Sequence, residues 1–144
     1  MQTLKVRYVV DGMVPMELND KGDWIDLRAA EDVKLKKGDH MYISLGFAMQ
    51  LPDGYEAHVA PRSSTYKNFG IIQTNSVAVI DNSYRGNNDI WKYPILAMRD
   101  TEIHKNDRIC QFRIVKKMEP VVFQFVDEFE NSEDRGGFGS TGIQ

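Results

Sequence analysis

The chain has 144 residues, of which 42% are apolar and 27% charged, the composition of one globular domain and not of a disordered or membrane-spanning chain. With 18 basic and 21 acidic residues its net charge is −3, which excludes a general attraction to nucleic acid or to an anionic membrane surface. Cys110 is the only cysteine, so no disulfide forms within the chain. The N-terminal MQTLKVRYVVDG lacks the hydrophobic segment of a signal peptide, and we expect a cytoplasmic protein.

Alternation of apolar and polar residues, the period of a β-strand, recurs along the chain. It begins at residues 4–10 and is clearest over 41–51, where every second residue is large and apolar. Further alternating segments follow at 110–114 and 121–125. Turn-forming triplets lie between such segments at 37–39, 52–54, 85–87 and 105–107. Many short strands with closely spaced turns predict an all-β fold, a barrel of the jelly-roll type.

Two segments depart from this pattern. Residues 63–70, SSTYKNFG, have hydroxyl residues at the start and a glycine at the end, which predicts one short helix near residues 63–69. From residue 128 the sequence becomes polar and rich in glycine, as is typical of a flexible C-terminal arm. We therefore expect a β-barrel domain over residues 1–127 and a mobile arm over 128–144.

Asp81 and the arm contain the residues best suited to chemistry. Asp81 directly follows an apolar segment, and a carboxylate held at the end of a strand is a candidate general base. It could equally cap the following turn through backbone N–H groups. Residues 137–142 match the glycine pattern of dinucleotide-binding folds, but no strand precedes them and two residues follow, so that fold is excluded. Their N–H and hydroxyl groups, with Arg135, either surround phosphate oxygens or belong to a disordered tail.

Five short motifs, in this order, resemble those of the homotrimeric dUTP pyrophosphatase (dUTPase) family, most closely its branch in Gram-positive bacteria and their phages. The motifs are WIDL at 24–27, PRSS at 61–64, VID and YRG within 79–86, DRICQ at 107–111 and RGGFGSTG at 135–142. Each motif alone is weak, but five in the right order and spacing are specific. The resemblance implies a β-clip, jelly-roll-like barrel that forms a homotrimer with active sites shared between chains. It also implies Mg²⁺-dependent hydrolysis of dUTP to dUMP and pyrophosphate by attack of water on the α-phosphorus.

The resemblance also implies a role for particular residues. Asp81 activates the attacking water, and Tyr84 packs against the deoxyribose and leaves no room for a 2′-hydroxyl. The hairpin 75–86 reads the uracil edge through Asn75 and backbone groups that include those of Ile80. Asp26 supports the magnesium ion through water, while the triphosphate oxygens hold the ion itself. Phosphates are held by residues of the second and fourth motifs and by the arm, whose phenylalanine stacks on the base: Arg62, Ser63, Ser64, Gln111, Arg135, Phe138, Gly139, Ser140 and Thr141.

The chain departs from the family pattern at several positions. A tryptophan, Trp24, stands in the first motif where small residues are usual, and Ala78 replaces a glycine before the third. Arg135 lies nearer the glycine run than is common, which changes its reach toward the γ-phosphate. Trp91 and Tyr93 either share the stacking role of the arm's phenylalanine or pack in a strand.

Two other functions stay open from the sequence. A dCTP deaminase can use the same fold, but deamination needs an acid/base carboxylate beside the pyrimidine, and no glutamate occurs between Glu56 and Glu102. The second alternative is a trimeric regulatory module that binds a protein partner, such as a repressor if the chain is phage-borne. The presence of Asp81, Tyr84 and Arg135 argues against a regulatory module that has lost catalysis, and leaves a second, regulatory role open.

Overall fold

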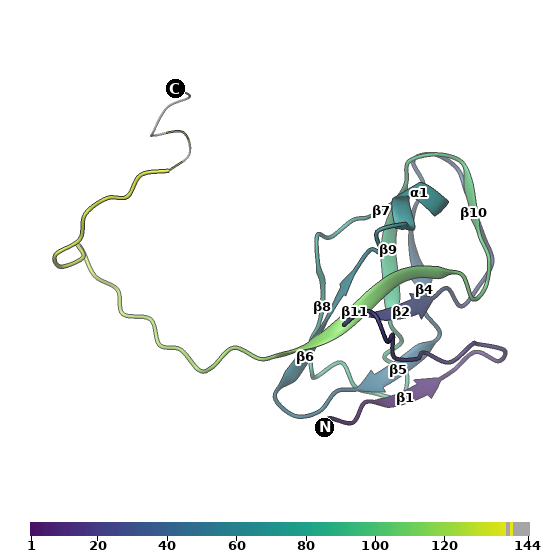
Figure 1. The fold of residues 1–144 in the computed structure, drawn as a ribbon, viewed down its shortest axis with the longest axis horizontal. Coiled ribbons are helices and arrows are strands. Elements are labelled where there is room, and N and C mark those ends of the chain that lie inside the picture. Colours follow the sequence, from purple (N-terminus) through teal and green to yellow (C-terminus); the bar gives the residue numbers. More distant parts are fainter. Residues whose placement is uncertain (138, 140–144) are drawn as a thin grey trace.

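A computed structural model describes residues 1–137 and 139 of the chain (Figure 1). Its regular elements, within those residues, are short antiparallel strands and one helix of 5 residues. In chain order they are β1 (Lys5–Tyr8), β2 (Ile25–Arg28), β3 (Val33–Leu35), β4 (His40–Ser44), β5 (Phe47–Gln50), β6 (Tyr55–Ala60), α1 (Thr65–Phe69), β7 (Ile71–Gln73), β8 (Ala78–Ile80), β9 (Lys92–Ala97), β10 (Thr101–Ile103) and β11 (Arg108–Lys116). The prediction of an all-β fold with one short helix is confirmed.

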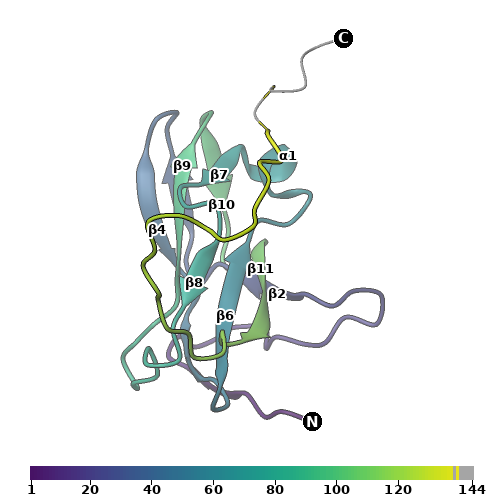
Figure 2. The same cartoon turned by 90° about the vertical axis from the view of Figure 1, so that its left-hand side faces the viewer.

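The strands pair with partners that are distant in the chain. The two larger sheets have the strand orders β2-β11-β6-β8 and β4-β9-β7, and two further ladders join β1 to β5 and β10 to β3. Among the described residues no strand pairs with the next one along the chain. Successive strands therefore lie in different sheets (Figures 1 and 2). This connectivity is the one expected of a jelly roll.

Residues 75–86 do not form the hairpin that we expected. β7, which precedes this segment, pairs with β9, whereas β8 pairs with β6. The segment is therefore a loop, one short strand and a turn. Because β8 takes its ladder from β6, the position of Asp81 at its end is set by β6.

The segment 41–51 supplies the centre of the core, as its alternation predicts. It forms two strands, β4 and β5, because the chain bends at Gly46, whose φ is 77°. A left-handed φ of this kind favours glycine, and a Cβ at this position would lie 2.9 Å from that of Ala30. The large apolar side chains of residues 43–51 are all buried: Ile43, Leu45, Phe47, Met49 and Leu51.

An aromatic cluster joins the two halves of the core. The Trp91 ring lies 5.0 Å from that of Phe47 and 5.3 Å from that of Phe112, centroid to centroid. Trp91 and Tyr93 are 1% and 0% exposed. Of the two alternatives for these residues, the structure therefore supports packing in the core and not stacking on a ligand.

The chain beyond β11 leaves the barrel. The prediction of a strand over 121–125 is wrong for the isolated chain, since the described residues after Lys116 contain neither strand nor helix. Figure 1 shows this segment extending away from the sheets. Residues 121–125 therefore have no neighbouring strand of the same chain with which to form a ladder. Among the described residues, no helix is long and apolar enough to cross a membrane.

Helix α1 is held to the barrel by the hydroxyl of its first residue. Thr65 is 1% exposed, and its Oγ1 accepts a hydrogen bond from the Arg62 N–H at 2.8 Å and donates one to the Ile109 carbonyl at 2.9 Å. The expected cap by a preceding serine is not formed, because the Ser64 side chain makes no capping bond. Gly70 ends the helix with a φ of 61°, as predicted. Thr65 therefore fixes the loop before the helix against β11.

We expect Thr65→Val to lower the free energy of unfolding by about 1 to 3 kcal/mol, because the substitution keeps the volume but leaves a buried carbonyl and an N–H without a partner. Thr65→Ser, which keeps the hydroxyl, should cost less. Urea unfolding of the three proteins at one fixed chain concentration measures the difference. Equal midpoints for wild type and Thr65→Val would show that the hydroxyl does not anchor the loop.

Candidate functional site

Three of the five motifs meet at one end of the largest sheet. In the register of β11, Gln111 lies opposite Asp26 of β2 on one side and Ala60 of β6 on the other. The Gln111 side-chain amide donates to the Pro61 carbonyl at 3.1 Å. The ladder thus brings the first, second and fourth motifs into contact, although they are far apart in the sequence.

A β-bulge in β11 decides which of its side chains face this site. The register against β2 shifts between Arg108 and Cys110, and the two consecutive residues Ile109 and Cys110 are both fully buried. Without the extra residue, strict alternation would turn Arg108 into the core, because it lies two positions from Cys110. The bulge instead places the Arg108 guanidinium on the outer face, next to Asp26.

Asp26 lies between two arginine side chains. Its Oδ1 is 3.0 Å from Nε of Arg62 and its Oδ2 is 3.7 Å from Nη1 of Arg108. Arg62 also donates to the Arg108 carbonyl at 3.3 Å. The Arg62 and Asp26 side chains are about one quarter exposed, at 25% and 27%. This cluster leaves more positive than negative charge beside the sheet, which suits a polyanionic ligand.

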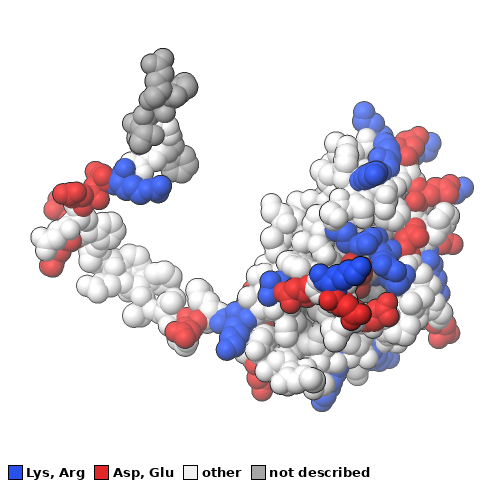
Figure 3. Space-filling view, in the orientation of Figure 1, with Lys and Arg blue, Asp and Glu red and all other residues white. Residues whose placement is uncertain are grey.

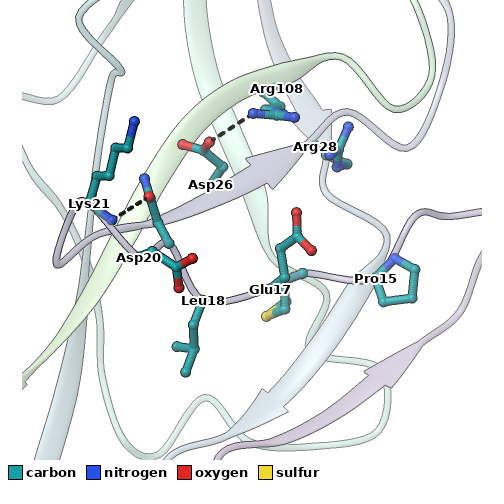
Figure 4. A pocket seen from close by; sticks show the side chains of 10 residues that line it. Pro15, Glu17, Leu18, Asp20, Lys21, Asp26, Arg28 and Arg108 are labelled. Carbon is teal, nitrogen blue, oxygen red and sulfur yellow. Dashed lines mark hydrogen bonds and ion pairs between the residues drawn. The ribbon is translucent and has the colours of Figure 1, made fainter.

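The cluster borders two hollows. Figure 4 shows Asp26, Arg28 and Arg108 facing the first, a cavity of about 360 Å³ that residues 15–21 of the loop before β2 also line. The second, of about 270 Å³, has the loop after β6 in its lining. It is lined by residues of the second motif, α1, β7 and the loop before β8: Pro61, Arg62, Ser63, Tyr66, Ile71, Ile72, Gln73, Asn75 and Ser76. The structure therefore brings Arg62, Ser63 and Asn75 together, with Ser64 half-buried beside them.

Asp81 is exposed in the turn that follows β8. Its Oδ2 accepts hydrogen bonds from the Ser83 hydroxyl at 2.5 Å and from the Ser83 backbone N–H at 2.9 Å. These bonds, the hydroxyl's first, and the charge of Lys117 lower the pKa of Asp81 below its ordinary value. The carboxylate thus caps the turn, as one of our two interpretations predicts, and it is also ionised and open to water, as a general base requires.

The turn is fixed to the barrel by a side chain that sequence reasoning missed. The Asn82 amide nitrogen donates to the carbonyls of Pro52 and Tyr55, both at 2.9 Å, and its oxygen accepts from Arg85 at 2.7 Å. Asparagine is common in turns because its side chain bonds to nearby backbone groups. The asparagine directly after Asp81 was therefore the signal in the sequence that this turn is held by a side chain. Three hydrogen bonds from a half-buried amide hold the turn in one conformation.

Tyr84 closes the same loop from its other side. Its hydroxyl donates to the Ile90 carbonyl at 2.9 Å, and partial burial, followed by the charge of Asp89, raises its pKa above the ordinary value. The side chain is still 39% exposed. A neutral ring on an anchored loop, with one part free, can contact a ligand beside Asp81.

Asp81 and Arg62 lie at opposite ends of the β6–β8 ladder. Ala57, near the start of β6, lies opposite Ile80, the last residue of β8. Asp81 is therefore beside the start of β6, whereas Arg62 lies past its end. At a rise of about 3.3 Å per residue, the two are on the order of 15 to 20 Å apart. That distance is too long for both to contact the same phosphorus atom within one chain.

The arm residues form a third group. Arg135 and Gly139 are exposed, and Figure 1 shows the described part of the arm far from the barrel. Phe138, Ser140 and Thr141 lie outside the described residues. The predicted site residues that the structure describes thus fall into three separate groups.

The unusual tryptophan of the first motif is accommodated on the outer face of the sheet. The Arg113 guanidinium lies 5.9 Å from the centroid of the Trp24 ring and 3.0 Å from a carboxylate oxygen of Asp23. A cation over an aromatic face is a favourable contact. The departure from the family pattern is therefore matched by a partner on β11.

The residues near Asp26 suit a magnesium ion only if another molecule supplies most of its ligands. Within the described residues, no group of three or more His, Cys, Asp or Glu side chains could hold a metal ion. Both oxygens of Asp26 already face guanidinium groups. Mg²⁺ commonly keeps several waters and binds through substrate phosphates and one or two carboxylates, which is compatible with one carboxylate in a cationic cluster.

Comparison with known proteins agrees with this arrangement. A family model described as dUTPase matches residues 24–142. The chain is 59% identical over 141 residues to the SPbeta prophage-derived deoxyuridine 5′-triphosphate nucleotidohydrolase YosS of Bacillus subtilis, covering 98% of this chain and 99% of the relative. A solved dUTPase of Staphylococcus bacteriophage 80alpha with dUPNHPP is similar with a TM-score of 0.76 and 26% identity, over 98% of this chain and 99% of that one.

A second solved structure is similar in fold. It is a dUTPase of phage phi11 of S. aureus, described for the coordination of a structural Mg(II) ion, with a TM-score of 0.72 and 22% identity over 89% of this chain and 99% of that one. The match of the family model and the identity to a relative of equal length agree with the order of the five motifs and with the jelly-roll connectivity. This chain belongs to the dUTPase family.

Proposed function

We propose that this chain is a dUTP diphosphatase, which hydrolyses dUTP to dUMP and pyrophosphate. The observation that carries the proposal is an ionised, exposed Asp81 on a turn anchored to the barrel, in a fold that also presents a cationic cluster around Arg62. The relative in Bacillus subtilis is named for the same activity. Whole-length similarity and the two parts of the site point to the same reaction.

In the proposed reaction, Asp81 takes a proton from the water that attacks the α-phosphorus. The new bond joins the water oxygen to the α-phosphorus, and the bond from this phosphorus to the bridging oxygen breaks, so pyrophosphate leaves. Asp81 is suited to the role because it is ionised, and because its turn is held by Asn82. A fixed base saves the cost of ordering the water and the carboxylate in the transition state.

The cationic cluster is proposed to hold the phosphates. Hydrogen-bond donors lie in or directly beside the second hollow, of about 270 Å³. They are the side chains of Arg62, Ser63, Ser64 and Gln111. When nucleotide binds, a phosphate competes with Asp26 for the Arg62 guanidinium, which frees the carboxylate to support a magnesium ion through water. Mg²⁺ bound to the triphosphate would neutralise charge that develops on the leaving pyrophosphate.

The base and sugar are proposed to lie against the segment 75–86. Asn75 and backbone groups that include those of Ile80 would read the uracil edge, and Tyr84 would contact the deoxyribose. Support comes from the exposed ring of Tyr84, fixed by its bond to Ile90. A ring held at this place leaves no space for an additional hydroxyl on the sugar.

We further propose that the active site is shared between chains of a homotrimer. Within one chain Asp81 and Arg62 lie at opposite ends of the β6–β8 ladder, on the order of 15 to 20 Å apart, which supports a site in which a second chain supplies one of them. The segment 121–129 supports assembly, because six of its apolar side chains are exposed: Val121, Val122, Phe123, Phe125, Val126 and Phe129. Figure 3 shows a largely white stretch in the extended segment, beyond the charged residues where it leaves the barrel. An apolar stretch of this kind is expected to be covered in the assembled protein.

The division of the chain into a barrel over 1–127 and an arm over 128–144 remains part of this proposal. Arg135, Gly139, Ser140 and Thr141 would close over the β- and γ-phosphates, with Phe138 over the base. The polar, glycine-rich sequence of the arm supports a segment that orders when a ligand supplies its contacts. Closure of the arm would exclude water other than the one that reacts.

We expect Asp81→Asn to keep the fold and nucleotide binding but to lower kcat by roughly 10²- to 10⁴-fold, since an amide does not accept the proton. Pyrophosphate release from dUTP at fixed Mg²⁺ measures the effect. Asp11→Asn, an exposed aspartate in the loop between β1 and β2, is the matched control and should retain activity. Turnover of Asp81→Asn within threefold of wild type would remove Asp81 from its role, and ammonia from dCTP instead of pyrophosphate from dUTP would favour a deaminase.

Tyr84→Ala should reduce the preference for dUTP over UTP by about 1 to 3 kcal/mol, the range of a steric discrimination in a binding pocket. The ratio of the two kcat/KM values is the measurement. Tyr84→Phe keeps the ring and loses only the hydrogen bond to Ile90, so most of the preference should remain. An unchanged ratio in Tyr84→Ala would place the discrimination elsewhere.

Mixed trimers test the shared site. Arg62→Gln and Asp81→Asn chains should each form inactive homotrimers, whereas trimers that contain both chains should recover about one third of wild-type turnover per chain, because in a cyclic mixed trimer one of the three sites combines an intact Asp81 from one chain with an intact Arg62 from its neighbour. Two different affinity tags verify the mixing. If verified mixed trimers show no recovery, both residues serve a site within one chain.

A further inference from the structure

The carboxylate of Asp81 is held on one side only. Both hydrogen bonds to this carboxylate that come from described residues end on Oδ2, from the hydroxyl and the backbone N–H of Ser83 at 2.5 and 2.9 Å. Oδ1 is therefore the oxygen open to water. Two charge-assisted hydrogen bonds to a single oxygen restrict the rotation of the carboxylate about its last bond more than one bond would.

Ser83 itself belongs to a turn with little freedom. Asn82 binds the carbonyls of Pro52 and Tyr55, and Arg85 bridges from Asn82 to the carbonyl of Leu51 at 3.3 Å. The Tyr84 N–H also donates to the Asp81 carbonyl at 3.0 Å. Ser83 lies between these anchored residues, so its hydroxyl reaches Asp81 from a fixed position.

We propose that Ser83 is a positioning residue for the reaction: it holds Oδ2 of Asp81 so that Oδ1 is directed to the attacking water. This inference rests on the proposed role of Asp81 as the base. Ser83 does not touch the substrate in this proposal and acts only through Asp81. Its hydroxyl donates to Asp81 Oδ2 and takes no part in the proton transfer.

The Ser83 hydroxyl also affects the pH at which Asp81 is protonated. Hydrogen bonds to the ionised form lower the pKa of a carboxyl group, and the Ser83 hydroxyl is the largest cause of the lowered pKa of Asp81. The positive charge of Lys117, in the segment after β11, also lowers the pKa of Asp81. Below its pKa the carboxyl is protonated and cannot accept a proton. Removing the Ser83 hydroxyl therefore raises this pKa and moves the acidic limb of kcat/KM toward higher pH.

The test compares Ser83→Ala and Ser83→Thr in the full chain. At a pH above the acidic limb we expect Ser83→Ala to lower kcat by about three- to thirtyfold, with the limb moved to higher pH. Ser83→Thr, which keeps a hydroxyl, should restore both. Because Ser83 is exposed, neither substitution should affect folding, and matching unfolding curves check this.

Two further measurements separate this inference from the proposed function. NMR titration of the Asp81 carboxyl carbon reports its pKa without any turnover, and this pKa should be higher in Ser83→Ala. In an Asp81→Asn background Ser83→Ala should have no additional effect on kcat. An unchanged acidic limb and carboxyl pKa in Ser83→Ala, or a further loss in the double variant equal to that in the single one, would overturn the role of Ser83. Normal turnover of Asp81→Asn alone would instead overturn the proposed role of Asp81.

Discussion

The candidate site depends on the pairing of β11 with β2 on one side and β6 on the other. This central strand brings Asp26, Gln111 and the loop after β6 to the same end of the sheet. The ion pairs of Asp26 with Arg62 and Arg108 form where the ladder has already placed their backbones. Partly exposed ion pairs contribute little to folding, so the backbone ladder and the buried Thr65, and not the charges, hold the cluster in position. The charges remain available to a ligand.

The turn that carries Asp81 is held in place by side-chain hydrogen bonds instead of a backbone ladder. Asp81 is exposed and is not held by packing in the core. Its position depends on its neighbours in the turn, Asn82 and Arg85, which bind carbonyls of residues 51–55. These bonds hold the turn while the carboxylate stays in water. An exposed acid with a lowered pKa can serve as a base across the neutral range, whereas a buried one would need compensation for its desolvation.

The ladder between β6 and β8 separates Asp81 from Arg62 along the length of β6. This separation within one chain is the main support for the proposal that each active site is built from more than one copy. The apolar residues exposed between 121 and 129 also support this proposal, because no other part of the described chain covers them. The same segment carries the strand pattern that the isolated chain leaves unpaired. Assembly and catalysis would then depend on the same contacts.

The alternation of side chains and the spacing of turns were enough to determine the all-β fold, the short helix ending at Gly70 and the buried face of residues 41–51, because these follow from local periodicity. The five motifs also identified the family. The hairpin expected over 75–86 and the strand over 121–125 were wrong, because strand pairing joins distant segments and periodicity does not name the partner. Only the tertiary structure revealed the bulge at Ile109 that turns Arg108 toward Asp26, and the distance between Asp81 and Arg62. Both depend on the register of β11 and β6 with their neighbours, which no local pattern specifies.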